Sequence, residues 1–341
     1  MSARRALRLA AAALLCAAAL TSSVRAAETT LHFTLDRRLE GPAAPFLLPL
    51  DKGFYKAEGL NVAIDPAPNM REAIKRVASG EYDMGFADIN AMIKFRDANP
   101  KQPIKAVFMV YNRPPFAVIG RKSRGIAAPK DLEGRKLGAP MDSDSFSLWP
   151  IFAKVNGIDA SKVAVESIGV QVRNPMLAAG QVDAITGLAY SSFVDLKDKG
   201  VPVDDLTVLL MADYGVDVYG NAVVVNPQFA ADHPEAVKGF LRAFLHGLKM
   251  TVASPAAALG YVMERSDATR KDLELERLQM VIRQNIVTPE VKANGYGGVD
   301  GERLQRGLEQ LAISYKFKQP PKPDDVFDAS FLPPAAERKA N

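Results

Sequence analysis

Apolar and polar residues alternate along the chain in two patterns, one typical of strands and the other typical of helices. Short apolar or alternating runs predict strands at residues 31–36, 60–64, 82–87, 104–111, 116–119, 137–139, 206–211 and 216–225. A helical spacing of apolar residues predicts helices at residues 45–55, 70–79, 192–199, 234–252, 255–264, 270–284 and 300–314. Because strands and helices alternate in the first two thirds of the chain, we expect βαβ units and a mainly parallel sheet.

One strand–helix–strand unit occurs twice, about one hundred residues apart. In the first copy Gly80 and Asp83 follow a helical run, and in the second copy Gly180 and Asp183 do so at the same offset. Two such units predict two similar α/β lobes, and lobes of this kind hold a ligand in the cleft between them. The alternative is that Gly-x-x-Asp is ordinary turn chemistry, since glycine suits the left-handed position after a helix.

The N-terminus has the layout of a secretory signal peptide. Three arginines precede an apolar run at residues 9–20, and small residues follow at Ala26 and Ala27. The run is shorter than the roughly 20 apolar residues that a membrane-spanning helix needs. We therefore expect residues 1–26 to be removed on export and the remaining chain to be a periplasmic protein.

The remaining chain is long enough for two lobes. We expect residues 27–120 to form the first part of lobe 1, residues 121–215 to form lobe 2, and residues 216–341 to return to lobe 1 with the C-terminal helices. The two crossings between the lobes would act as a hinge. The proline- and lysine-rich tail from residue 319 is expected either to wrap the surface or to be mobile.

Charge and cysteine content exclude several classes of protein. Removing residues 1–26 takes away four of the 43 basic residues and none of the 39 acidic ones, so the exported chain would be close to neutral. No basic stripe interleaved with aromatic residues occurs in it, and we expect no nucleic-acid partner. The single cysteine, Cys16, lies in the predicted signal peptide, which excludes a disulfide or a cysteine nucleophile in the exported protein.

Motifs for catalysis or cofactor binding are absent from the sequence. There is no glycine-rich dinucleotide fingerprint after a strand, no phosphate-binding loop and no Gly-x-Ser-x-Gly elbow. The three histidines, His32, His233 and His246, lie far apart without ligand spacing. We therefore expect no enzyme, no cofactor and no metal site.

Polar residues gather in loops at the carboxyl ends of predicted strands, where open α/β sheets bind ligands. A further group lies in the second crossing segment, around Tyr219. For each Ser or Asp the alternative role is helix capping, and for Arg173 it is a solvated position in the first turn of a helix. The candidate ligand-binding residues are Asp36, Arg37, Asp88, Asn90, Asp142, Ser143, Asp144, Ser145, Arg173, Gly187, Tyr190, Asp217 and Tyr219.

Several of these segments resemble a known family. Residues 53–62, GFYKAEGLNV, resemble the G-(Y/F)-F-x-x-E-G-L-x-V signature of solute-binding proteins of the NMT1/THI5-like (nitrate/sulfonate/taurine) group. Residues 80–85, 177–184 and 219–222 are similar to further elements of that family. The resemblance implies a type II periplasmic binding fold, lobe closure over a ligand and delivery to an inner-membrane ABC permease by a monomer.

The chain also departs from that family's patterns. Members that bind pyrimidine precursors of thiamine usually carry an aromatic residue and a Pro-Asn pair after the Asp of the first strand, whereas Arg37 and Arg38 follow Asp36 here. The pyrimidine-synthesising enzymes of this fold need a cysteine-rich motif and a substrate histidine, and the exported chain would have no cysteine.

The sequence thus favours a periplasmic binding protein that captures a small polar organic molecule. An aromatic or heterocyclic acid, a pyrimidine-like compound and a sulfonate all remain open as ligands, with a slight preference for a heterocycle or aromatic acid. The alternatives are an enzyme of the same fold with Asp36, Asp144 or Asp217 as general base, and a binding subunit that serves a sensor.

Overall fold

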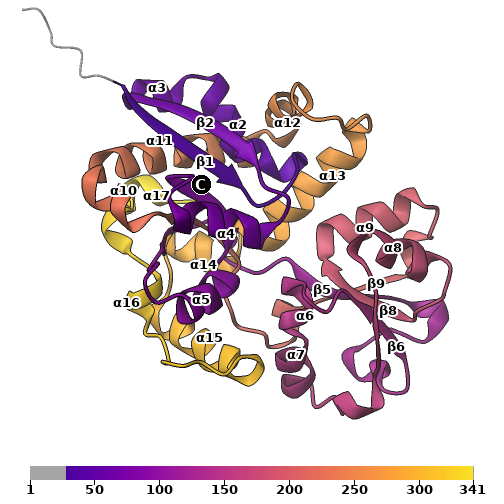
Figure 1. The fold of residues 1–341 in the computed structure, drawn as a ribbon. Coiled ribbons are helices and arrows are strands. Elements are labelled where there is room, and N and C mark those ends of the chain that lie inside the picture. Colours follow the sequence, from indigo (N-terminus) through magenta and orange to yellow (C-terminus); the bar gives the residue numbers. More distant parts are fainter. Residues whose placement is uncertain (1–27, 341) are drawn as a thin grey trace, which may run out of the picture.

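The computed structural model describes residues 28–340, so the predicted signal peptide at residues 1–26 lies outside the described residues. Figure 1 shows two lobes side by side, each built on its own β-sheet with helices on both faces. The N-terminal strand and the C-terminal third of the chain lie in the same lobe, which we call lobe 1.

The sheet of lobe 1 has five strands in the order β2-β1-β3-β10-β4. The first three strands run parallel to one another, and β10 is antiparallel to both of its neighbours. The strands β3, β4 and β10 are almost continuously buried, as expected where a sheet is covered on both faces, whereas the edge strand β2 alternates between buried and exposed residues. The strands are β1 (Thr29–Leu35), β2 (Leu60–Pro66), β3 (Met84–Asp88), β4 (Lys105–Met109) and β10 (Asn221–Val225).

The sheet of lobe 2 repeats this arrangement in the order β7-β6-β8-β5-β9. Here β5 takes the place of β10 and is antiparallel to both β8 and β9. The strands are β5 (Phe116–Arg121), β6 (Lys136–Ala139), β7 (Ala164–Ser167), β8 (Ala184–Leu188) and β9 (Leu206–Leu210).

Each sheet contains one strand that follows directly in the chain from a strand of the other lobe. The antiparallel strand β5 reaches lobe 2 directly from β4 of lobe 1, and β10 reaches lobe 1 directly from β9 of lobe 2. The chain therefore crosses between the lobes at residues 110–115 and 211–220. The first crossing is earlier than the sequence-based boundary at residue 121, because β5 pairs with the second sheet over its whole length.

The repeated Gly-x-x-Asp units have the same structural role in both lobes. Gly80 and Gly180 adopt the left-handed conformation, with φ of 81° and 70°. The carboxylate of Asp83 accepts a hydrogen bond from the backbone of β1 (2.7 Å), and that of Asp183 accepts one from the backbone of β6 (2.9 Å). The repeat is therefore real, and in each lobe the aspartate joins the start of the central strand, β3 or β8, to the neighbouring strand.

The helices of the first two thirds of the chain follow the expected pattern with one break. The helix expected at residues 45–55 is divided at Gly53, whose φ of 71° ends one helix before the next begins. The helices of lobe 1 are α2 (Ala44–Asp51), α3 (Phe54–Ala57), α4 (Met70–Ser79) and α5 (Ile89–Ala98). Those of lobe 2 are α6 (Asp144–Ser147), α7 (Trp149–Val155), α8 (Val170–Ala178) and α9 (Ala189–Asp198).

The C-terminal third is helical, as the sequence predicts. Its long helix α11 packs on α2 and the first sheet through stacked aromatic rings. The ring centres of Phe33 and Phe240 lie 4.9 Å apart, and those of Phe46 and Phe244 lie 4.6 Å apart. The helices are α10 (Pro227–Asp232), α11 (Pro234–Ala253), α12 (Pro255–Met263), α13 (Lys271–Val281), α14 (Pro289–Asn294), α15 (Gly301–Ser314), α16 (Pro323–Val326) and α17 (Ala335–Arg338).

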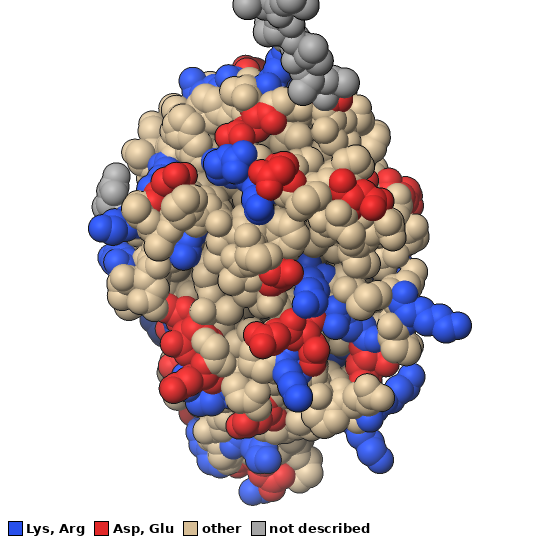
Figure 2. Space-filling model, turned by 90° about the vertical axis from the view of Figure 1, so that its left-hand side faces the viewer, with Lys and Arg blue, Asp and Glu red and all other residues tan. Residues whose placement is uncertain are grey.

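The tail wraps the surface of lobe 1, which decides between the two expectations for it. Phe327 forms a β-bridge to Ala106 of β4, and Tyr296 and Arg338 exchange hydrogen bonds near the C-terminus. No helix within residues 28–340 is long and apolar enough to cross a membrane. On the face in Figure 2 acidic and basic side chains are interspersed, with no extended patch of one sign.

Candidate functional site

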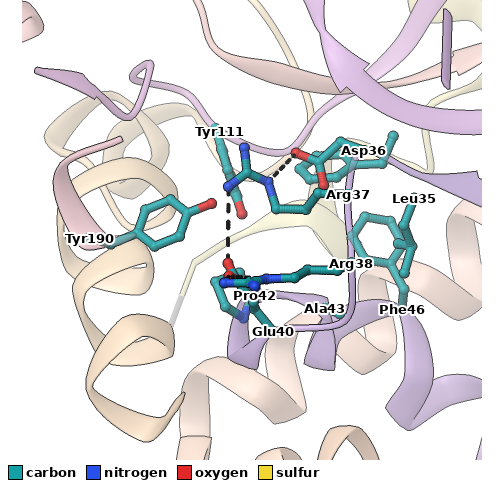
Figure 3. Close-up of a pocket in the computed structure, with 11 residues that line it drawn as sticks. Leu35, Asp36, Arg37, Arg38, Glu40, Pro42, Ala43, Phe46, Tyr111 and Tyr190 are labelled. Carbon is teal, nitrogen blue, oxygen red and sulfur yellow. Dashed lines mark hydrogen bonds and ion pairs between the residues drawn. The ribbon is translucent and has the colours of Figure 1, made fainter. Parts of the chain in front are cut away.

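A polar pocket lies at the carboxyl end of β1, where the two lobes meet. Lobe 1 contributes the loop after β1 and Tyr111, and lobe 2 contributes Tyr190 from the first turn of α9 (Figure 3). The space between these side chains is only about 10 Å³, roughly room for one water molecule. The lining residues are Leu35, Asp36, Arg37, Arg38, Glu40, Pro42, Ala43, Phe46, Phe86, Tyr111 and Tyr190.

Arg37 fills the centre of this pocket. Figure 3 shows its guanidinium between the carboxylates of Asp36 and Glu40, with the hydroxyl of Tyr190 pointing toward it. Both ion pairs are long, 3.6 Å from Nε to Asp36 and 4.0 Å from Nη1 to Glu40, and the guanidinium makes no hydrogen bond within the described chain. Glu40 instead accepts two hydrogen bonds from Arg38 (2.8 and 2.9 Å).

Asp36 is the carboxyl group at the floor of the pocket. It is 7% exposed, and its Oδ2 accepts a hydrogen bond from Nδ2 of Asn221 (3.0 Å), the first residue of β10. Burial raises the pKa of Asp36 to about 6, although the positive charge of Arg37 acts in the opposite direction. At neutral pH this carboxyl is mostly ionised and can accept hydrogen bonds from a ligand.

Lobe 2 presents a second guanidinium toward the first. Arg173, on α8, is 9% exposed, and its pKa is lowered to about 10 by burial and then by the charge of Arg37. Its side chain lies over Gly187 near the end of β8: a Cβ there would be 3.3 Å from Cζ of Arg173 and 2.6 Å from Oγ of Ser192. The glycine therefore lets both polar side chains approach the strand.

Two carboxyl groups face each other across the cleft beside this pocket. Asp88, which is 1% exposed, caps α5 by accepting a hydrogen bond from the backbone N–H of Ala91 (2.9 Å). Asp144, at the start of α6 in lobe 2, forms an ion pair of 3.3 Å with Arg71 of lobe 1. Burial and the charge of Asp144 raise the pKa of Asp88 to about 7.

Helix α13 holds the lobes together on the other side of the cleft. It packs against both the loop at Gly41 in lobe 1 and helix α9 of lobe 2 (Figure 1). Arg277 of this helix donates hydrogen bonds to Glu274, on the same helix, and to Asp195 of α9. Glu274 in turn accepts a hydrogen bond from the backbone N–H of Gly41 (2.7 Å). We call Gly41, Glu274, Arg277 and Asp195 the interlobe clasp.

Two exposed ion pairs flank the clasp. Lys197 contacts Glu276 at 2.8 Å, and Arg270 contacts Asp198 at 3.0 Å, each pair joining α9 to the chain at or just before α13. Together with the pair of Asp144 with lobe 1, they describe two lobes in a closed arrangement.

The structure brings most of the sequence-predicted residues to this interface, with different roles. Asp36, Arg37 and Tyr190 line the pocket, and Arg173 and Gly187 lie behind it in lobe 2. The remaining candidates at the strand ends stabilise local structure or lie at the surface. Asn90 donates to the backbone oxygen of Tyr219 (2.7 Å), Ser143 caps α6 and lies 3.2 Å from Ser145, Asp144 forms its ion pair, and Asp142 is exposed.

Asp217 and Tyr219 belong to the hinge instead of the pocket lining. Tyr219 donates its hydroxyl to Glu290 (2.6 Å), and the guanidinium of Arg303 lies 4.1 Å from its ring centre. Asp217 accepts a hydrogen bond from Arg303 (2.9 Å), which also donates to the backbone oxygen of Asn112 (3.0 Å) in the other crossing. Arg303 thus joins the two crossing segments, and Tyr219 is buried in that network.

Sequence reasoning missed Glu40 and Tyr111 in the pocket lining. Tyr111 lies two residues after β4, so the rule that ligands bind at strand ends could have found it. Glu40 follows a polar turn and has no periodicity that separates it from other loop carboxylates. Asn221, two residues after Tyr219, was not among the candidates, and its side chain donates a hydrogen bond to Asp36.

Comparisons with known proteins agree with this architecture. The family model described as NMT1/THI5 like matches residues 42–258. The chain is 28% identical over 297 residues to the riboflavin-binding protein RibY of Chloroflexus aurantiacus, covering 85% of this chain and 82% of that protein. It is also 28% identical over 225 residues to the 4-amino-5-hydroxymethyl-2-methylpyrimidine phosphate synthase of Aspergillus parasiticus, covering 63% and 64%.

Solved structures show the same fold. The periplasmic aliphatic sulphonate binding protein SsuA of Escherichia coli superposes with a TM-score of 0.66 at 13% identity, covering 86% of this chain and 93% of that one. The mixed α/β architecture with two five-stranded sheets is therefore the periplasmic binding protein fold that the sequence predicts.

Proposed function

The chain belongs to the NMT1/THI5-like family, and from that premise we propose that it is the periplasmic substrate-binding component of an ABC importer. It would capture a small polar organic molecule between its lobes and deliver it to an inner-membrane permease, acting as a monomer. Export by the predicted signal peptide would place it where such a protein works.

One observation carries this proposal. The pocket combines charged and aromatic side chains of lobe 1 with Tyr190 of lobe 2, and the lobes are joined by two crossings that share one anchor, Arg303. Opening about those crossings would expose the pocket, and closing would remove its contents from water and strengthen each polar contact. The swapped strands β5 and β10 place the crossings directly beside the pocket.

The pocket favours a ligand with a flat ring and several polar groups. Tyr111 and Tyr190 contribute aromatic rings to the lining, while Asp36 offers a carboxylate that can accept hydrogen bonds. A heterocycle or aromatic acid suits these groups, which is also the ligand class that the sequence favoured. Tyr219 does not support this preference, because it lies in the hinge and not in the pocket lining. Because Arg37 occupies the pocket centre, a ligand must displace that side chain on entry.

The similarity to a pyrimidine phosphate synthase favours a second candidate, an enzyme on the same fold. Residues 28–340 contain no cysteine, and none of the three histidines lines the pocket. His246, for example, stacks on Phe54 at 4.2 Å, on the outer side of lobe 1. The remaining base would be Asp36, whose pKa of about 6 is compatible with general-base chemistry near neutral pH.

A thermal-shift screen with analysis of the small molecules separates these candidates. A binding protein saturated at one hundred times its dissociation constant gains about 2.7 kcal/mol, which raises Tm by about 5 °C for a chain of this size. The proposal expects such a rise for one chemical class, with the compound recovered unchanged after incubation. Conversion of the stabilising compound into a product would refute the transport role and support the enzyme.

A further inference from the structure

Two guanidinium groups from opposite lobes lie close enough to interact electrostatically, and neither has a hydrogen-bond acceptor within residues 28–340: Arg37, whose side chain is 24% exposed, and the buried Arg173. Arg37 comes from lobe 1 and Arg173 from lobe 2, and neither donates a hydrogen bond to any residue in the described part of the chain. Each guanidinium carries five N–H donors in a planar fork. The hydroxyl of Ser192, beside Arg173 at Gly187, is also buried without a partner.

Such an arrangement is costly unless something satisfies it. A buried charge without hydrogen bonds is strongly disfavoured, and two like charges close together raise that cost. Arg173 is the clearer case because it has neither an ion pair nor a hydrogen bond within residues 28–340, and only 9% of it is exposed.

Nearby carboxylates do not fill this role, because none of them accepts a hydrogen bond from Arg37 or Arg173. Asp36 accepts from Asn221 and Asp195 from Arg277. Glu40 accepts from Arg38 through Oε1, and its Oε2 makes no hydrogen bond within the described chain and stays 4.0 Å from Nη1 of Arg37. What the site lacks is an acceptor that bridges the two lobes.

We propose that an anionic group of the ligand binds between Arg37 and Arg173, with the hydroxyl of Ser192 as a third donor. A carboxylate, a sulfonate and a phosphate share the required chemistry, since each offers two or more oxygens to a guanidinium fork. The anion would neutralise the two like charges as the lobes close, so the ligand itself would favour closure. This inference rests on the proposed function and adds the sign of the ligand's charge.

Paired probes test the inference directly. The exported form of the protein is titrated by calorimetry with compounds that differ only by an anionic group: riboflavin and its 5′-phosphate, 4-amino-5-hydroxymethyl-2-methylpyrimidine and its phosphate, and uracil and uracil-6-carboxylate. Sodium sulfate is a probe without any ring, compared with sodium chloride at equal ionic strength.

The variant Arg173→Gln should weaken the anionic member of a pair, or sulfate, by about ten- to a hundredfold, the effect of one hydrogen bond to a charged group. Without ligand this variant should melt at the same temperature as the wild type or higher, because it removes an uncompensated buried charge. A purely structural arginine would instead lower Tm when replaced. Ser192→Ala, which changes no charge, provides a second and smaller loss of affinity.

The matched control is Arg124→Gln. Arg124 is exposed, makes no ion pair or hydrogen bond with residues 28–340, and lies against Gly180 at the opposite end of β8. This control should bind the anionic probe as the wild type does.

Three results would overturn the inference. If a neutral probe binds as tightly as its anionic partner, or if Arg173→Gln leaves anion affinity unchanged, the site is not anionic and the binding function stands. If neither sulfate nor any anionic probe binds more than chloride does, the inference is also wrong, whereas the transport role is decided separately by the thermal-shift screen.

Discussion

Replacement of Arg277 by glutamine should open the lobes, because Arg277 is the member of the interlobe clasp that reaches across the cleft. Its side chain is 8% exposed, and it donates to Glu274 on its own helix and to Asp195 of the other lobe. In the variant Glu274 keeps its hydrogen bond from Gly41, and Asp195 keeps one from Asn174 (3.0 Å). The substitution therefore removes the link without leaving a carboxylate unpartnered.

The magnitude follows from the exposure of the pair. A hydrogen bond between charged groups contributes about 1.5–3 kcal/mol. The side chain of Asp195 is 30% exposed, so solvent screening and the desolvation of Arg277 favour the lower end of that range. A loss of about 1.5 kcal/mol changes the ratio of closed to open molecules by about tenfold.

Distance measurements between spin labels on the two lobes test this prediction without a known ligand. Lys56→Cys on α3 and Lys154→Cys on α7 are exposed positions, and the natural Cys16 lies in the predicted signal peptide, so only the introduced sites would be labelled. The variant should shift the distance distribution toward longer separations.

Arg270→Gln is the control for the clasp, because it breaks an exposed pair between the same two regions, with side chains 57% and 44% exposed. It should leave the distribution almost unchanged. Equal shifts in both variants, or no shift with Arg277→Gln, would refute the assignment of closure to the clasp.

Three further predictions follow from individual contacts. The pKa of Asp88 is raised from 3.8 to about 7, so the folded state binds this proton more tightly than the unfolded state does. Its contribution to the free energy of unfolding is therefore full below pH 4 and is progressively lost as pH rises to 7. The variant Asp88→Asn should flatten this part of the pH profile of Tm. Gly187→Ala places a Cβ 2.6 Å from a buried hydroxyl and should cost about 1–3 kcal/mol of unfolding free energy by urea titration, whereas Gly260→Ala has open space and should not destabilise. Tyr219→Phe should lower the free energy of unfolding by about 1–3 kcal/mol but leave ligand affinity within twofold. A large loss of affinity would show that Tyr219 contacts the ligand.

Local patterns predicted most of the elements, because each depends on nearby residues. The helix at residues 300–314 begins where Asp300 accepts a hydrogen bond from the backbone of Arg303 (2.7 Å), and Asp88 caps α5 as expected from its place after a strand. The tandem glycine and aspartate units also predicted two similar lobes, since each unit closes its own helix and anchors its own strand.

The site was only partly predictable, because its geometry depends on residues far apart in sequence. Tyr219 was favoured as a ligand contact for its place in the crossing segment, but Arg303 and Glu290, more than 70 residues later, hold it in the hinge. The direction of Arg173 depends on the absence of a side chain at Gly187. No periodicity within α8 shows that this arginine is buried.

The most direct test of the central claim is native mass spectrometry of the protein, expressed with its natural N-terminus and purified without refolding. The account predicts one small organic molecule per chain, carrying a carboxylate, sulfonate or phosphate and released unchanged on gentle denaturation. The same preparation of Arg173→Gln should be largely empty. A natively folded wild-type protein that holds no molecule and responds to none in the thermal-shift screen would contradict the account, as would a bound compound that the protein converts to product.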